Sequence, residues 1–92
     1  MNQVLENKKK SLIALKKANT LIGKIIKMVD NNEYCIDIMQ QNLATIGLLK
    51  SVHEKLMEGH LNSCFKNAMA SKNEILKQKM IDEIIKVSKY NK

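Results

Sequence analysis

The chain has 92 residues, a formal net charge of +7, three aromatic residues and no proline, and 45% of its residues are hydrophobic. This size and composition predict one domain over residues 1–92 and exclude both a disordered chain and a strand-rich fold. No run of about 18 apolar residues is present, and no apolar signal region follows the lysine-rich start, so we expect a cytoplasmic protein without membrane contact.

The first predicted element is a helix over about residues 5–29, because apolar residues recur there in steps of three and four. Its predicted apolar face consists of Leu15, Ala18, Ile22, Ile25 and Val29. Lys10, Lys17 and Lys24 are seven residues apart and Lys27 follows, and we call these four residues the lysine stripe. The stripe is either a contact for nucleic-acid phosphates or a solvated helix face.

The second predicted element is one long helix over about residues 33–69. The run Asp30-Asn31-Asn32 before it has turn and capping residues, and Gly47 is the one helix breaker between residues 37 and 58. Its apolar residues at helical spacing are Met39, Leu43, Ile46, Leu49, Val52 and Leu56. We interpret His53 as an interface residue, and Met39 and Met57 as core side chains.

The third predicted element is a short amphipathic helix over about residues 72–89, expected to cover the second helix. Ser71 and Glu74 have the spacing of a capping box, in which each side chain bonds to the other residue's backbone. The apolar residues of this helix are Leu76, Met80, Ile81, Ile84, Ile85 and Val87.

Both cysteines and both histidines lie in the second helix. His60 and Cys64 are four residues apart, so they share a helix face and can hold one ion. Cys35 precedes His60 by 25 residues, which is about 37 Å along a helix, and cannot join them within one chain. An antiparallel copy crossing near Leu48 and Leu49 would place Cys35 of one subunit beside His60 and Cys64 of the other. Such a dimer contains two intersubunit sites.

The donor set is soft. Cys35 is in the first turn of its helix, where unpaired N–H groups and the helix dipole favour a thiolate. Two thiolates and one imidazole suit Cu(I) in a trigonal arrangement, whereas zinc needs a fourth ligand, for example a water or a carboxylate. The same thiols could also oxidise across the dimer or carry a persulfide.

The pattern Tyr-Cys-Ile-Asp-Ile at residues 34–38, followed by His60-Leu61 and Cys64, resembles the CsoR/RcnR family of small bacterial metal-responsive transcriptional regulators. The resemblance covers about residues 15–85. It implies an all-α fold, with a three-helix subunit, an antiparallel dimer and a dimer of dimers.

Within that family, the ligand set Cys35, His60 and Cys64 looks like the Cu(I)-sensing branch rather than the nickel/cobalt, formaldehyde or persulfide branches. The resemblance also implies that Tyr34 and Glu83 support the ligands through hydrogen bonds. His60 would then connect the metal to the third helix.

The chain departs from the family in the first helix, which commonly carries an arginine- and glycine-rich run that contributes to DNA binding. Residues 16–24 here read Lys-Lys-Ala-Asn-Thr-Leu-Ile-Gly-Lys, and the chain has no arginine. Lys17 matches a basic position of the family, but Gly23 and Ala14 are neutral. Operator contact would therefore depend on the lysine stripe.

These observations predict a Cu(I)-responsive repressor that binds operator DNA without metal and is released when copper binds. One alternative is a repressor of the same fold that senses persulfide or oxidants through Cys35 and Cys64. Another is a copper-binding protein that does not bind DNA, which the missing arginines suggest. An enzyme is not expected, because no nucleophile and base with a third orienting group are evident.

Overall fold

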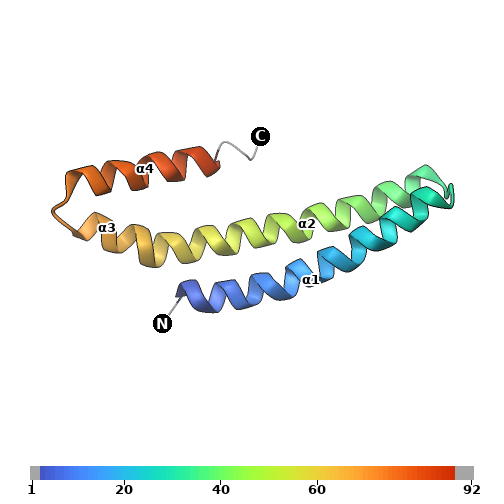
Figure 1. Cartoon of the computed structure of the whole chain (residues 1–92), viewed down its shortest axis with the longest axis horizontal. Coiled ribbons are helices and arrows are strands. Elements are labelled where there is room, and N and C mark those ends of the chain that lie inside the picture. The colour runs from blue at the N-terminus through green and yellow to red at the C-terminus, as the bar shows by residue number, and fades with distance from the viewer. Residues whose placement is uncertain (1–2, 89–92) are drawn as a thin grey trace.

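The computed structural model describes residues 3–88, so the predicted end of the third helix at residue 89 lies outside the described residues. The elements are α1 (Gln3–Asp30), α2 (Cys35–His60), the π-helical turn η1 (Leu61–Phe65), α3 (Lys66–Ala70) and α4 (Glu74–Ser88). Figure 1 shows that α2, η1 and α3 follow one another as one long rod, with α1 and α4 beside it. The all-α fold with a long central helix is confirmed, and residues 3–88 contain no strand. None of the helices in this range is long and apolar enough to cross a bilayer.

An antiparallel hairpin of α1 and α2 forms the packed part of the chain (Figure 1). The buried residues of α1 recur in steps of three and four or sums of these, and they are Asn7, Ser11, Ala14, Ala18 and Met28. Those of α2 are Thr45, Val52 and Gly59. Most of these side chains are small, which lets the two backbones approach closely. We call this contact the seam.

The predicted apolar face of the first helix is only partly correct. Ala18 is buried in the seam and Ile25 is half-buried, but Leu15, Ile22 and Val29 are exposed. The helix carries two apolar stripes, one of small residues and one of large residues. The small residues face α2, and the large ones remain on the surface.

The turn between α1 and α2 is fixed by backbone bonds. Asn32 has a positive φ of 59°, the left-handed conformation that commonly ends a helix. Its N–H donates to the carbonyl of Val29 at 3.0 Å, and the N–H of Glu33 donates to that of Met28 at 3.0 Å. These two bonds make a Schellman motif, so the predicted break after Asp30 marks a well-defined reversal of the chain.

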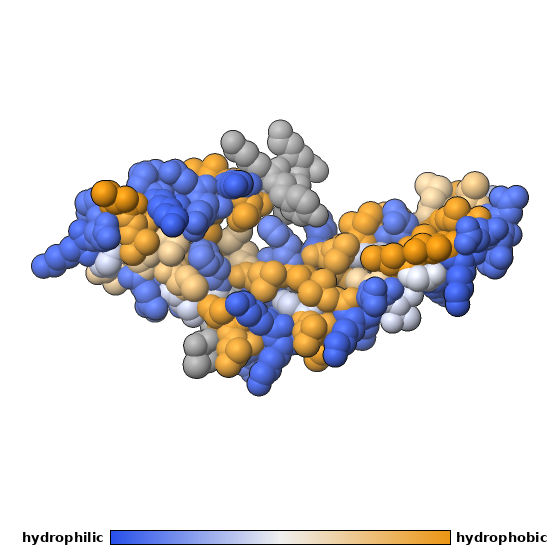
Figure 2. Space-filling model, viewed as in Figure 1, coloured by the Kyte–Doolittle hydropathy of each residue, from blue (hydrophilic) through white to orange (hydrophobic). Residues whose placement is uncertain are grey.

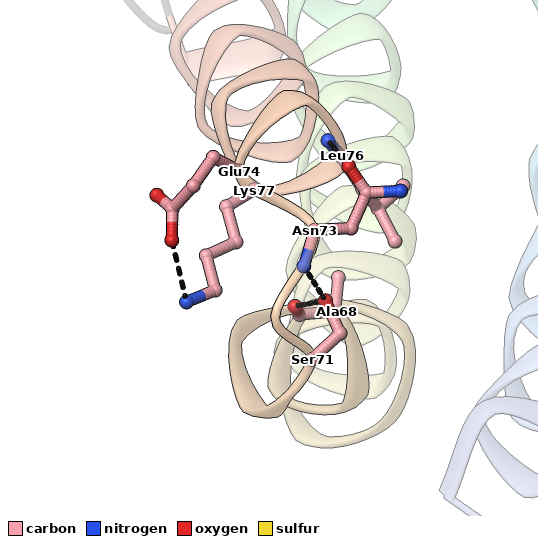
Figure 3. A network of polar contacts seen from close by, with 6 residues as sticks. All are labelled: Ala68, Ser71, Asn73, Glu74, Leu76 and Lys77. Atoms are coloured by element: carbon pink, nitrogen blue, oxygen red, sulfur yellow. Dashed lines mark hydrogen bonds and ion pairs between the residues drawn. The ribbon is translucent and has the colours of Figure 1, made fainter.

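The cap of α4 differs from the predicted capping box. Asn73, rather than Ser71, caps the helix, because its Oδ1 accepts from the N–H of Leu76 at 3.0 Å (Figure 3). Ser71 Oγ instead donates to the carbonyl of Ala68 at 2.7 Å, and Glu74 pairs with Lys77 at 3.3 Å. The helix begins at Glu74, two residues later than predicted, so the capping role moves to the residue just before it.

The cover that α4 provides is loose. It has no buried residue, and Ile75 is 84% exposed. It runs back along α2 in Figure 1 and leaves a groove between them. The expectation that the third helix covers the second is therefore not met by close packing within one chain.

Large hydrophobic side chains remain on the surface of the hairpin, and Figure 2 shows many of them along one face. On α1 they are Leu5, Leu12, Ile13, Leu15, Ile22, Ile26 and Val29. On α2 they are Ile36, Met39, Leu43, Ile46, Leu49 and Leu56. Apolar surface of this extent is more than a monomer usually exposes, so it is a candidate surface for association.

Candidate metal centre

The side of α2 turned away from the seam carries a second periodic row, which we call the outer stripe. It advances in steps of three and four and consists of Met39, Leu43, Ile46, Lys50, His53, Met57, His60 and Cys64. Cys35 lies one turn before its first member. All three predicted metal ligands therefore lie on or next to the same stripe, at its two ends.

At the start of α2, Cys35 is an exposed free thiol. Tyr34 precedes the helix, is 69% exposed and makes no side-chain capping bond. Its carbonyl instead accepts from the N–H groups of Asp37 and Ile38, at 3.1 and 3.2 Å. No side chain caps this end of α2, so the thiol lies beside the unpaired backbone N–H groups of the first turn.

At the other end, His60 is the last residue of α2, and Cys64 lies in the π-turn η1. A π-turn contains more residues per turn than an α-helix, but residues four apart still lie about one turn apart in it. This turn was not predicted, because residues 61–65 contain neither glycine nor proline.

His60 and Cys64 also share a concavity of about 270 Å³ with the start of α1. The other residues that line it are Val4, Asn7, Lys8, Leu56 and Gly59. His60 is half-buried and Cys64 is an exposed free thiol, so both donors are accessible from this concavity.

A single chain offers only parts of the predicted site. Within residues 3–88, no three side chains of His, Cys, Asp or Glu lie close enough to hold a metal ion. The structure brings His60 and Cys64 together, and the unbroken α2 keeps Cys35 about 37 Å from them. The residue types fit a soft metal, and their placement divides the donors between the two ends of one helix.

The two residues predicted to support the ligands, Tyr34 and Glu83, also lie near opposite ends of α2. Glu83 and His60 line the same groove of about 460 Å³ between α2 and α4, together with His53. Tyr34 is beside Cys35 at the far end of α2. One chain therefore places Glu83 near the histidine and Tyr34 near the distant cysteine.

Each lysine of the lysine stripe is exposed on α1. None of them is in an ion pair within the described part of the chain, where the one ion pair joins Lys77 and Glu74. Gly23 lies between two of these lysines, and a Cβ added there meets no atom within 4 Å. The basic face therefore has no acidic partner in this range and has room for another long side chain.

The model of the metal-sensitive transcriptional repressor family matches residues 7–90. The copper-sensing transcriptional repressor CsoR of Mycobacterium ulcerans is 29% identical over 89 residues, 97% of this chain and 74% of the relative. The copper-sensing transcriptional repressor RicR of Mycobacterium tuberculosis is 32% identical over 56 residues, 61% of this chain and 58% of the relative. CsoR of Bacillus subtilis, also named a copper-sensing transcriptional repressor, is 35% identical over 57 residues, 62% of this chain and 56% of the relative.

Proposed function

The chain belongs to the metal-sensitive transcriptional repressor family, and on this premise we propose that it is a Cu(I)-responsive repressor. Without metal it binds operator DNA, and Cu(I) lowers its affinity for that DNA. The relatives named as copper-sensing repressors support the choice of metal. The proposed ligands are Cys35 of one subunit with His60 and Cys64 of another.

One observation carries the proposal: the candidate metal donors lie at the two ends of the outer stripe, whose first half is exposed and apolar. That stripe needs a partner surface, because Met39, Leu43 and Ile46 are each about half exposed or more. A second copy that covers it would bury both ends of α2. The same contact would then bury apolar surface and complete the ligand set.

An antiparallel two-fold contact satisfies both requirements. If the dyad lies near Leu48 and Leu49, Cys35 is about as far from it on one side as His60 and Cys64 are on the other. Each end of α2 then faces the opposite end of the partner's α2, and two equal sites form. The exposed large residues of α1 remain for a contact between two such dimers.

The donor chemistry favours Cu(I). Two thiolates and one imidazole are soft ligands in a number that suits a trigonal ion, and a structural zinc site would need a fourth. Glu83 in the groove beside His60 can orient the imidazole, and Tyr34 of the partner would enter with Cys35. Groups of this kind typically change metal affinity by about 10- to 100-fold.

The lysine stripe supplies the DNA contact in this proposal. Lysine binds phosphate as a point charge, so the stripe contributes affinity and salt dependence rather than a bidentate reading of bases. A repressor that binds chromosomal DNA would act in the cytoplasm of a bacterial cell.

An anaerobic titration tests the proposal. Fluorescence anisotropy with an operator from the protein's own gene neighbourhood is measured with and without Cu(I), after metal stoichiometry has been determined by absorbance. We expect one Cu(I) per subunit and at least about a tenfold loss of DNA affinity. Undiminished DNA binding at full copper loading would contradict it, and absence of DNA binding in the apo protein would favour a copper-binding protein without DNA recognition.

A second candidate is a thiol-based repressor of the same fold, which responds to persulfide or oxidants. The observation that favours it is that Cys35 and Cys64 are both exposed free thiols. His60→Ala separates the two proposals. It should abolish the response to Cu(I) and leave a response to persulfide intact.

A further inference from the structure

Asn7 is a buried polar residue in the seam between α1 and α2. Its side chain is 2% exposed, and its Nδ2 donates to the carbonyl of Lys55 at 2.8 Å and to Glu58 Oε1 at 3.4 Å. A buried amide between two helices sets how one helix is placed along the other. These bonds therefore fix the start of α1 against one particular turn of α2.

That turn is the one directly before the metal half-site. Lys55 and Glu58 precede His60 by five and two residues, and Asn7 lines the same concavity as His60 and Cys64. The start of α1 also contacts η1, which contains Cys64. A change in the backbone of this turn would move the Lys55 carbonyl and the Glu58 carboxylate, which accept hydrogen bonds from the Asn7 amide.

The far end of α1 is held by the Schellman turn at residues 28–33. Between Asn7 and that turn α1 is an unbroken helix, so it can pivot as a rod about 36 Å long. Lys10 is three residues from Asn7, whereas Lys27 is beside the pivot. A displacement at Asn7 would move Lys10 most and Lys27 least, so it would change where the lysine stripe lies relative to the rest of the subunit.

We propose that Asn7 is a positioning residue that couples the metal-binding turn to the lysine stripe. The coupling rests on the function proposed above. Ligation by His60 and Cys64 changes the turn that presents the Lys55 carbonyl and the Glu58 carboxylate, and the Asn7 amide carries that change into α1. Asn7 itself touches neither the DNA nor the metal in this role.

The test variant is Asn7→Leu, which places an apolar side chain of similar size in the seam and removes both donated bonds. Asn7→Asp is the second variant, because it keeps the shape and cannot donate as a carboxylate. Asn19→Ala, at an exposed asparagine of the same helix, and Ser11→Ala, at another buried polar residue of the seam, are the controls. Circular dichroism first establishes that each variant is helical.

Three quantities are then measured: Cu(I) affinity by competition, DNA affinity of the apo protein, and DNA affinity with Cu(I) bound. Hydrogen exchange of residues 4–10, with and without Cu(I) and in the absence of DNA, provides a readout that does not depend on repression. In both Asn7 variants we expect the copper-dependent loss of DNA affinity to shrink by at least about fivefold. The copper-dependent change in exchange should also disappear, while both controls behave as wild type.

The outcomes separate the two proposals. If the wild type responds to copper and either folded Asn7 variant keeps the full response, the role of Asn7 is wrong and the proposed function stands. If copper binds the wild type without changing its DNA affinity, the proposed function fails, and the coupling role fails with it.

Discussion

The two faces of α2 differ in how much of their surface is buried within the chain. The face toward α1 buries Thr45, Val52 and Gly59 against small residues, and the Asn7 amide bonds across it. The outer stripe exposes Leu43 at 66% and has the candidate metal ligands at its two ends. The same helix thus has one face completed within the chain and one face that still needs a partner.

The face of α2 that packs in the hairpin is therefore not the face that carries the candidate metal ligands. The seam joins α1 and α2 within one chain and contains none of the candidate metal ligands. The outer stripe brings no set of three ligands together in the described part of one chain. In the proposed function, association is the step that would bring three ligands together, and metal binding would then be linked to the assembly.

The largest effect is expected at the ends of the outer stripe. Cys35→Ala and Cys64→Ala should each lower Cu(I) affinity by well over about 100-fold, because even residues that only orient a ligand contribute up to that much. Competition with a chromophoric Cu(I) chelator measures it. Ser63→Ala, in the same π-turn, is the matched control and should keep the wild-type affinity. Equal losses at the two distant cysteines are required by the proposal, and a wild-type affinity in either variant would contradict it.

The next largest effect is expected from a substitution in the middle of the outer stripe. Ile46→Glu places a charge where two subunits are proposed to meet near the dyad, and a buried unpaired charge costs about 3 kcal/mol or more. We expect the dimer to dissociate about 100-fold more readily. Sedimentation velocity measures the change, with Gln40→Glu, at an exposed polar position of the same helix, as the control. If the Ile46→Glu dimer were as stable as the wild-type dimer, the outer stripe would not be the interface.

A smaller effect is expected from substitutions in or beside the lysine stripe, which lies on α1 and belongs to neither face of α2. Lys17→Ala should lower DNA affinity and reduce the slope of log K against log salt concentration by about one. Gly23→Lys should do the reverse, because the position is exposed and open. Anisotropy titrations over a range of salt concentrations measure both. A pair of variants with identical slopes would show that this side of α1 does not contact phosphate.

The smallest effect is expected within the seam. Ser11 is 3% exposed, and its Oγ has no hydrogen-bond partner among the described residues. Ser11→Ala removes this buried hydroxyl and should raise the free energy of unfolding by about 0.5–1 kcal/mol, with Cu(I) affinity unchanged. Chemical denaturation measures it. A clear loss of stability would mean that the hydroxyl is bonded.

Sequence periodicity predicted the three helices well, because steps of three and four depend only on helix geometry. It did not choose between the two apolar stripes of α1, since Leu15, Ile22 and Val29 fit the pattern as well as the small residues do. That choice depends on how closely two backbones can approach. The π-turn at Leu61–Phe65 was missed because it depends on local backbone bonds that leave no distinct residue pattern. The cap at Asn73 was missed because Ser71, which has Glu74 three residues later, matched the capping-box spacing and was preferred to it.

The candidate ligands were identified from residue type and spacing alone, and the argument that Cys35 belongs to another subunit followed from helix length. The structure adds the contacts between helices, which a helical pattern does not contain. It places His60 and Cys64 in one concavity with the start of α1, and Glu83 in one groove with His60. These contacts join residues far apart in the sequence, so no local pattern predicts them.

A subunit-mixing experiment tests the central claim most directly. Cys35→Ala protein is combined with the double variant His60→Ala/Cys64→Ala, the two are refolded together, and tagged mixed dimers are isolated for anaerobic Cu(I) titration. Each parent homodimer should lack the high-affinity site, whereas the mixed dimer should bind one Cu(I) with wild-type affinity. The first subunit then supplies His60 and Cys64, and the second supplies Cys35. A mixed dimer that binds no better than its parents would contradict a site shared between subunits.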